Sequence, residues 1–477
     1  MPSPTDFNLS PYYDDFTESK KFHRILFRPS FAVQARELTQ SQTILQNQVE
    51  RLSDHFFEKG TMVIPGEIGY DLNYYAVKLS SIASGFTLSS FSVGDILTGG
   101  TSGVTATIIN SVATDGTDPD TLYVKYNDSV LINKSYGYHT YDSINKVNNT
   151  HIYDLASLTK VLASTLSIMK LYDENKLDLE EKVSYYFPEL KKSNKKNTTI
   201  FQSLSHTSGW VPYISHQNFV KKRNGDLKRS FIRNKKTKRF SIEITDDLYL
   251  KNTYSKKIFK RIRKSKLNNT GLYEYSGLFF FYVPSLINMI SGYDFESYFK
   301  KTFLNNKSSL TFNPSKNFKK EIIAPSEYDS IFRKGLVHGY VHDEAASFMG
   351  GISGNAGLFG NAESVGVLLN TLEPENPMFK QSTVQKFTSY AFKNSPIRRG
   401  LGFDKPYSSI EYGEYPNKNL SKNSFGHTGF TGTMFWVDPD KKLTIVFLTN
   451  RVYPSRENQS FYENNVRSKL IDILIKK

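Results

Sequence analysis

The sequence predicts an α+β protein in which a small helix-plus-β region precedes a larger domain of helices and antiparallel strands. Three observations support this fold class. A seven-residue apolar repeat runs through residues 35–60, short β-like runs fill residues 61–128, and the remainder combines a helix-like stretch at 153–177 with a β-hairpin at 425–451. With 477 residues, 38% of them hydrophobic, the chain is long enough for two or three domains with a sizeable core.

The composition excludes several classes of chemistry. The chain has no cysteine, which rules out disulfides, thiol catalysis and thiolate metal sites. No apolar run is long enough to span a bilayer, and the N-terminus lacks the basic and apolar segments of a secretory signal. We therefore expect no membrane span and no export signal, and the compartment stays open.

The formal net charge of +15 raises the question of a nucleic-acid partner. Much of the positive charge lies in two runs, residues 221–240 and 255–266, without zinc-finger spacing or an RNA-binding signature. We expect these runs to form a solvated insertion and to bind no specific nucleic acid. The alternative is attraction to an anionic surface or substrate.

The first predicted helix covers residues 35–60. Leu38, Leu45 and Leu52 recur every seven residues, and Val49 adds to the same apolar stripe. Gly60 is a plausible helix end. The stripe is short for an independent coiled coil, so we expect it to pack against a neighbouring subunit or sheet, which makes self-association a candidate role.

Residues 61–128 read as short strands separated by turns. The segments "VTATII" and "TLYVKY" alternate apolar and polar residues, and "GGTSG" and "TDGTDPD" are the turn candidates. No catalytic grouping stands out in this region. A structural or assembly role is the expectation for residues 1–128.

Four stretches of this region, "NLSPYYDDF", "FHRILFRPSFAVQARELTQSQTILQNQVER", "GTMVIPG" and "VGDILTGGTSGVTATI", resemble a virion structural protein of tailed myophages. The resemblance implies a tail or baseplate component, with a virion as the partner, and no known chemistry.

The most informative short pattern in the second region is Ser157-x-x-Lys160, within "DLASLTKVLAS". The same spacing recurs at Ser143/Lys146, Ser167/Lys170, Ser193/Lys196 and Ser297/Lys300, so spacing alone decides nothing. Ser157 differs because it falls near the start of the predicted helix 153–177, with Asp154 as the candidate N-cap. A helix start favours developing negative charge, and Lys160 lies one turn later on the same face.

Two later segments add candidate partners. Tyr275 and Ser276 precede an aromatic helix-like run. Tyr275 is a candidate for proton transfer. The alternative is that Tyr275 packs in the aromatic core, as tyrosine side chains usually do. In the hairpin 425–451, glycines beside His427 and Thr428 allow a substrate to approach the strand closely.

Together these motifs give residues 129–477 a resemblance to the serine beta-lactamase and penicillin-binding-protein superfamily, in particular its class C-like hydrolases. The matching motifs are Ser157–Lys160, Tyr275-Ser276-Gly277 and His427-Thr428-Gly429, supported by "FQSLSHTSGW" (201–210) and "MGGISGNAGLFGNAES" (349–364). The resemblance implies an antiparallel sheet flanked by helices, with an all-helical subdomain between the first two motifs. It also assigns residues 461–477 to a helix that packs on the sheet.

The resemblance further implies a mechanism without a cofactor or metal. Ser157 attacks a carbonyl, Lys160 and Tyr275 move the proton, and the N–H groups of Ser157 and Phe430 form the oxyanion hole. The substrate-binding residues are His427, Thr428, Gly429 and Ser276. The substrate class is a small-molecule or peptidoglycan-like acyl compound, and the activity is D,D-peptidase-like, esterase-like or beta-lactamase-like.

Some features depart from this pattern or compete with it. Gly277 stands where the family usually has an asparagine or aspartate, which puts efficient beta-lactam turnover in doubt. A structural turn role is expected for His206. His338 and His342 have metal-ligand spacing, but Gly339 argues against a rigid helix there, so no metal site is expected.

The alternative to an enzyme is a virion structural protein with an inactive or binding-only hydrolase domain, or an artificial fusion of two genes. Relatives of the hydrolase region work in the periplasm or outside the cell, whereas the sequence here shows no export signal, and localisation stays open.

Overall fold

The computed structural model describes residues 7–56, 75–79, 86–98, 105–116, 118–126, 132–374, 376–409, 411 and 413–475. The chain divides into two compact units. The first comprises Met1–Leu97 and Ala106–Asn127, and the second comprises Thr98–Thr105 and Asp128–Lys477. Each unit is described by itself. Within the described residues no helix combines the length and the apolarity that a membrane span requires.

The predicted N-terminal helix is present as α1 (Ala35–Phe56), and the predicted end at Gly60 lies outside the described residues. One side of α1 is covered by the preceding segment, where Asp14 accepts a hydrogen bond from Thr43 Oγ1 and Asp15 accepts one from Gln40. The apolar stripe lies elsewhere on the helix, with Leu45 61% exposed. Its packing against another subunit stays a prediction.

The β-rich part of the first unit is a four-stranded antiparallel sheet in the order β1-β4-β3-β2. Its strands are β1 (Tyr75–Lys78), β2 (Ile96–Thr98), β3 (Thr105–Val112) and β4 (Thr121–Tyr126). The described part of the unit also contains the short helices η1 (Glu18–Lys20) and η2 (Leu88–Ser90). The alternation predicted in "VTATII" and "TLYVKY" is confirmed by β3 and β4, whose inward residues Ile108 and Val124 are buried. The predicted turn "GGTSG" lies outside the described residues.

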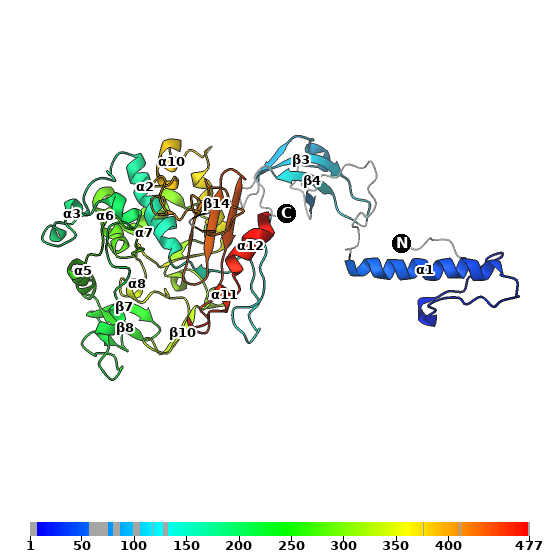
Figure 1. Cartoon of the computed structure of the whole chain (residues 1–477), viewed down its shortest axis with the longest axis horizontal. Coiled ribbons are helices and arrows are strands. Elements are labelled where there is room, and N and C mark those ends of the chain that lie inside the picture. Colours follow the sequence, from blue (N-terminus) through cyan, green and yellow to red (C-terminus); the bar gives the residue numbers. More distant parts are fainter. Residues whose placement is uncertain are drawn as a thin grey trace. The chain divides into compact units, whose positions relative to one another are not determined.

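The second unit is built of short helices around several small sheets (Figure 1). Its first half contains β5 (Tyr153–Asp154), η3 (Lys160–Thr165), α2 (Leu166–Asp173), α3 (Val183–Tyr186), η4 (Pro188–Leu190), α4 (Ile200–Leu204), η5 (His216–Val220), β6 (Ile232–Arg233), β7 (Phe240–Thr245), β8 (Leu248–Lys251), α5 (Ser255–Lys264), η6 (Phe279–Phe281), α6 (Val283–Ser291) and α7 (Phe295–Phe303).

Its second half contains β9 (Thr311–Phe312), η7 (Pro314–Lys316), η8 (Lys320–Ile322), β10 (Glu327–Asp329), β11 (Gly335–Val337), α8 (Glu344–Ser347), β12 (Leu358–Gly360), α9 (Ala362–Leu369), η9 (Asn370–Leu372), α10 (Gln381–Thr388), β13 (Phe425–Thr428), β14 (Met434–Asp438), β15 (Leu443–Phe447), α11 (Ser460–Glu463) and α12 (Val466–Ile475). The sheets have the orders β5-β12-β9, β6-β8-β7, β10-β11 and β13-β14-β15.

The predicted hairpin 425–451 is confirmed as the antiparallel pair β14–β15, and β13 extends it to three strands. The predicted C-terminal helix is confirmed as α12. Ile471 of α12 is fully buried against Trp436 and Ile445 of the sheet, so the helix covers one face of it (Figure 1).

The segment between the first two motifs differs from the all-helical subdomain that the resemblance implied. Strands β6, β7 and β8 form an antiparallel sheet there, between helices α4 and α5. Alternating residues explain the difference, because Ile244 and Leu250 are buried while Ser241 is exposed, the period of a half-buried strand. The second basic run is helical and coincides with α5.

The prediction of one helix over residues 153–177 is wrong at its start. Residues 153–154 form strand β5, which pairs with β12, and a turn follows at Ala156 and Ser157. Asp154 is therefore not a helix N-cap: its carboxylate accepts the backbone N–H of Ala156 at 2.8 Å. Strand pairing decided the local structure, since β5 is fixed by a partner some 200 residues later in the sequence.

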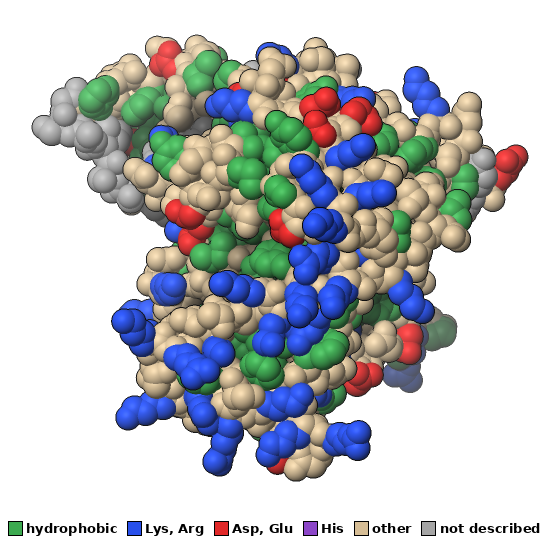
Figure 2. Space-filling view, turned by 90° about the vertical axis from the view of Figure 1, so that its left-hand side faces the viewer, with side chains coloured by type: hydrophobic (Ala, Val, Ile, Leu, Met, Phe, Trp, Pro, Cys, Tyr) green, Lys and Arg blue, Asp and Glu red, His purple; other side chains and the backbone are tan. Residues whose placement is uncertain are grey.

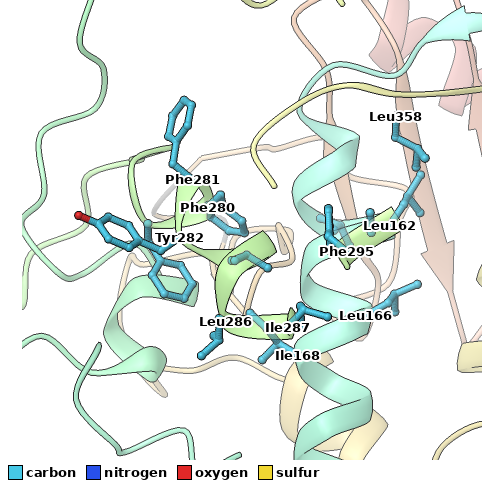
Figure 3. Packing of buried hydrophobic residues seen from close by; sticks show 14 of the residues in the cluster. Leu162, Leu166, Ile168, Phe280, Phe281, Tyr282, Leu286, Ile287, Phe295 and Leu358 are labelled. Atoms are coloured by element: carbon cyan, nitrogen blue, oxygen red, sulfur yellow. The ribbon is translucent and has the colours of Figure 1, made fainter. Parts of the chain in front are cut away.

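The main core forms where the helix after Ser157 meets the aromatic run of the second motif. Ile168 of α2 is fully buried and lies beside Leu286 and Ile287 of α6, in the same cluster as Phe280 of η6 (Figure 3). Burying such large side chains contributes roughly 1.5–3 kcal/mol each, so this contact fixes the first and second motifs relative to each other.

Candidate active site

Ser157 sits on a sharp turn between strand β5 and the helical segment η3–α2. Ala156 has a φ of +47°, a left-handed conformation that is uncommon for a residue with a side chain. The turn is held by Asp154, whose second carboxylate oxygen accepts the N–H of His342 at 2.6 Å. Such strain persists only where surrounding contacts impose it, and here the result is a half-buried serine at a helix start.

Lys160 is brought directly to Ser157. Its side chain is buried, and Nζ lies 3.0 Å from Ser157 Oγ and 2.9 Å from the carbonyl oxygen of Asn355. No carboxylate among the described residues forms an ion pair with it. Among the five Ser-x-x-Lys pairs, all within described residues, this is the one whose side chains are hydrogen-bonded.

The helix begins with a π-helical turn, η3, at Lys160. The hydroxyl of Thr165 donates a hydrogen bond of 2.8 Å to the backbone carbonyl of Lys160, five residues earlier. This bond links the two ends of the wide turn. Single π-helical turns are frequent at functional sites because they shift the side-chain register locally. The sequence reasoning missed this turn.

Asn355 is a neighbour of Lys160 that the sequence reasoning did not single out, although the Gly-rich segment 349–364 contains it. It is buried, and its Oδ1 accepts a hydrogen bond from Ser353 at 2.7 Å. A Cβ added at Gly277 would lie 3.5 Å from Cε of Lys160 and 4.0 Å from Cβ of Asn355. The glycine therefore leaves a space beside Lys160 that Asn355 borders.

Tyr275 lies against the same lysine. Its ring centroid is 5.4 Å from Nζ of Lys160, and the rings of His206 and His427 flank it at 4.5 and 6.0 Å. The guanidinium of Arg399 lies 5.3 Å from the ring centroid. No hydrogen bond joins its hydroxyl to Ser157 or Lys160, two residues that the structure describes.

His206 and Ser276 fix the position of that segment. The backbone N–H of Ser276 donates to Nδ1 of His206 at 3.1 Å, and the hydroxyl of Ser276 donates to the carbonyl of Val211 at 2.8 Å. His206 is in the left-handed region at φ +56° and is buried. The Ser276 hydroxyl is thus engaged with backbone, and its role toward a substrate stays a prediction.

His427 is buried at the end of β13. Its Nδ1 lies 2.8 Å from the carbonyl oxygen of Thr428, which can only accept, so the proton is on Nδ1 and Nε2 is an acceptor. Nε2 has no hydrogen-bond partner among the described residues. Burial, with Arg399 and Lys160 nearby, lowers the pKa of His427 to about 3, which keeps the ring neutral near pH 7.

The turn after His427 is tied to the Ser157 turn. Thr431 Oγ1 donates to the carbonyl of Asp154 at 2.8 Å, and Thr433 Oγ1 donates to that of Leu155 at 3.2 Å. A Cβ at Gly429 would lie 2.9 Å from the Leu155 carbonyl oxygen, so only glycine permits this approach. The two turns therefore meet at the backbone, as the predicted oxyanion hole requires.

Two arginines hold the carbonyl groups of this turn. Arg451 donates to the carbonyl of Phe430 at 3.0 Å, and Arg467 of α12 donates to that of Gly429 at 2.7 Å. The backbone N–H groups of Ser157 and Phe430 donate to no other described residue. Neither arginine was singled out from the sequence, because their partners are backbone atoms distant along the chain.

The two histidines with metal-ligand spacing lie in different surroundings. His338 Nε2 donates to backbone carbonyls at 2.7 and 2.8 Å, whereas His342 Nε2 bonds Glu327 at 2.7 Å. Within the described residues no group of three or more His, Cys, Asp or Glu side chains could hold a metal ion.

Acid is expected to destabilise the second unit because buried histidines are held neutral. Burial lowers the pKa of His216 to about 4 and that of His427 to about 3, from an ordinary 6.5. Below pH 6.5 the unfolded chain binds more protons than the folded chain, so stability present above pH 6.5 is lost as the pH falls toward 4. These two histidines together account for about 2.7 kcal/mol of unfolding free energy per pH unit.

Urea unfolding at pH 7 and pH 5 checks this prediction. The control is His216→Leu, which removes a buried ring whose two nitrogens lack partners among the described residues. This variant should lose about 1.4 kcal/mol less per pH unit than the wild type. Equal unfolding free energies at the two pH values in the wild type would contradict the prediction.

The sequence of this chain is similar to those of several known proteins. The chain is 26% identical over 370 residues to a protein of Escherichia coli K12 named "Putative D-alanyl-D-alanine carboxypeptidase", covering 71% of this chain and 77% of the relative. It is 28% identical over 353 residues to an N-acetylmuramyl-L-alanine amidase of Bacillus subtilis, covering 67% and 73%.

A solved structure, FmtA from Staphylococcus aureus, is 18% identical with a TM-score of 0.47, covering 70% of this chain and 80% of that one. Residues 10–120 match a family described as "Domain of unknown function (DUF4815)", which assigns no function to the N-terminal region. The virion role of that region stays a prediction.

The family model described as "Beta-lactamase" matches residues 112–465, well over half of the chain and a span that includes Ser157, Lys160, Tyr275 and His427. By this match, which covers the hydrogen-bonded Ser157–Lys160 pair, the protein belongs to the beta-lactamase family.

Proposed function

We propose that the protein is a serine acyl-hydrolase that cleaves an amide or ester through an acyl-enzyme at Ser157. The observation that carries the proposal is the 3.0 Å hydrogen bond between Lys160 Nζ and Ser157 Oγ, made by a buried lysine without a carboxylate partner among the described residues. A nucleophile and a base within hydrogen-bond reach are the arrangement that covalent catalysis needs.

In the proposed acylation step, Ser157 Oγ forms a bond to the substrate carbonyl carbon while its proton passes to the unprotonated amine of Lys160. The carbonyl oxygen becomes negative and accepts hydrogen bonds from the N–H groups of Ser157 and Phe430. The bond to the leaving group then breaks, and the leaving group takes a proton through Lys160 and Tyr275. Water attacks the acyl-enzyme in the reverse sense and releases the acid.

We infer a peptide-like substrate, of the kind that the relatives' names describe. The names of the Escherichia coli and Bacillus subtilis relatives both describe the cleavage of amide bonds. His427 is buried and carries no charge near pH 7, so it supplies no positive charge to a substrate carboxylate. Thr428 and Gly429 continue the same edge, where the half-buried Thr428 is the polar side chain nearer to a substrate.

The test is release of D-alanine from a peptide ending in D-Ala-D-Ala, compared with hydrolysis of p-nitrophenyl acetate and of a chromogenic cephalosporin. We expect release of D-alanine and hydrolysis of the ester, both abolished in Ser157→Ala, and slow turnover of the cephalosporin because Gly277 supplies no polar group beside Lys160. Ester hydrolysis without D-alanine release would assign an esterase instead.

The second candidate is a non-enzymatic structural protein, and the exposed apolar stripe of α1 favours it. Leu38, Leu45 and Leu52 are 54%, 61% and 61% exposed, as in a helix that packs against a partner. In this case none of the three substrates is hydrolysed, and neither a fluorescent penicillin nor a fluorophosphonate labels Ser157.

A further inference from the structure

A second candidate site lies on helix α5, outside the catalytic residues. A cavity of about 420 Å³ is lined by Lys257, Lys260, Arg261 and Lys264 of α5, together with Phe219 of η5 and two further residues. Figure 2 shows Lys and Arg side chains gathered on the face of the molecule that carries α5 and the β6–β8–β7 sheet. A merely solvated basic run, as expected from the sequence, does not explain why these cations line one hollow.

The cations of this cavity have no negative partner among the described residues. None of the four is within ion-pair distance of a described carboxylate, and α5 itself carries no acidic residue. Lys257, Lys260 and Lys264 are exposed, and like charges three or four positions apart on a helix each cost about 0.2–0.5 kcal/mol. Lys256 and Lys257 also oppose the helix dipole at its N-terminal end. An anion bound here would relieve both costs.

Some of the residues that line the cavity are held in place by specific contacts. Arg261 lies 3.9 Å from the ring centroid of Phe219 and donates to the hydroxyl of Tyr254 at 3.0 Å, which fixes its guanidinium. Behind the lining residue Ser265, the fully buried Lys195 donates to the Ser265 carbonyl at 2.8 Å. The cations at positions 257, 260, 261 and 264 share one helix face and span about 10 Å along its axis.

One loop connects this cavity to the catalytic segment. The carbonyl groups of Val211 and Pro212 accept hydrogen bonds from Ser276 Oγ and the Gly277 N–H, at 2.8 and 3.3 Å. Ile214, which lines the cavity, follows Pro212 by two residues and is therefore at most about 7 Å from it along the chain. Gly277 in turn lies beside Lys160, so this short loop links a residue of the cavity to a neighbour of the candidate catalytic lysine.

We propose that the α5 cavity binds the polyanionic part of the enzyme's substrate, an extended peptide-like chain with several carboxylates spread over about 10 Å. The identification of this ligand as a substrate rests on the proposed function. Nucleic acid is the competing occupant, and it is less favoured because Arg261 already lies against the ring of Phe219, the aromatic residue of the cavity, and leaves only its remaining 46% exposed surface for a base to stack on.

The test measures binding of a fluorescent oligoglutamate peptide by anisotropy in the full chain carrying Ser157→Ala, so that turnover plays no part. The cavity variant is Lys257→Gln/Lys260→Gln/Lys264→Gln, which keeps helix propensity and removes three charges. The matched control, Lys235→Gln/Lys236→Gln/Lys238→Gln, removes three charges from an exposed stretch of the same basic region.

We expect the cavity variant to weaken oligoglutamate binding at least about tenfold and to lower the salt dependence of log Kd, with little change in the control. Oligoglutamate should raise the melting temperature of the parent and not that of the cavity variant. In the active chain, the KM for an acidic peptide substrate should rise relative to that for p-nitrophenyl acetate in the cavity variant.

Equal weakening in both variants would assign the attraction to the general charge of the region and overturn the proposal. So would undiminished binding in the cavity variant, or much tighter binding of oligothymidylate than of oligoglutamate at α5. If the acyl-hydrolase proposal fails, the binding experiment still gives its own answer, because the Ser157→Ala chain needs no activity.

Discussion

Replacing Lys160 by methionine is expected to slow acylation of Ser157 by a fluorophosphonate probe on the order of 10³-fold. The physical reason is that Lys160 Nζ, 3.0 Å from Ser157 Oγ, is the proposed acceptor of the serine proton, and positioned acid–base groups typically contribute 10²- to 10⁴-fold. Methionine keeps a similar volume in the buried site and removes only the amine. The measurement is the rate of covalent labelling, followed in a gel.

Two controls separate this effect from a loss of folding. Lys170→Met alters a lysine of the same helical segment, whose Nζ bonds the carbonyl of Met378, and should label at close to the wild-type rate. Lys160→Arg places a guanidinium there that stays protonated near neutral pH and so cannot accept the serine proton, and it should be as slow as Lys160→Met. Wild-type labelling in either Lys160 variant would contradict the role proposed for the amine.

Replacing Asp404 by alanine is expected to lower the free energy of unfolding by about 3–5 kcal/mol, the usual effect of breaking a buried ion pair. Asp404 is 3% exposed and lies 2.8 Å from Arg399 and 3.0 Å from Arg398. Burial opposes the charge of Asp404, yet Arg399 and Arg398 hold the pKa of this carboxyl below its usual value. Its removal leaves Arg399, which is also buried, without that charge.

The ion pair between Asp404 and Arg399 also contacts residues of the candidate active site. The backbone of Asp404 exchanges two hydrogen bonds with Gly426, next to His427, and Arg399 lies over the ring of Tyr275. Urea unfolding measures the loss. The double variant Arg399→Met/Asp404→Leu should recover most of it, because apolar replacements remove both buried charges together. An Asp404→Ala variant as stable as the wild type would show that the pair adds nothing to stability.

Local patterns in the sequence were sufficient for several elements. Helix α1, strands β3 and β4 and the β14–β15 hairpin follow from the apolar patterns of their own short stretches, although the apolar stripe of α1 is exposed, and helix α12 follows from the family resemblance. The family motifs were likewise visible in the sequence, and the Ser157–Lys160 pair is hydrogen-bonded as three-residue helical spacing predicts.

Features set by distant partners were not predictable in this way. Residues 153–154 have a helix-like context but form strand β5, because β12 pairs with them. The β6–β8–β7 sheet, formed within residues 232–251, interrupts the expected helical subdomain for another reason, because that expectation came from the family resemblance and not from the alternating residues of the segment itself.

The sequence by itself determined that this chain joins a helix-plus-β region to a beta-lactamase-type domain, and it predicted a candidate site of Ser157, Lys160, Tyr275 and His427. Only the tertiary structure decided the surroundings that set their chemistry. Asn355 beside Lys160, Arg399 over Tyr275 and the burial that keeps His427 neutral all come from segments far apart in the chain. Hydrogen-bond distances and desolvation depend on how such segments pack, and no local pattern of residues encodes that packing.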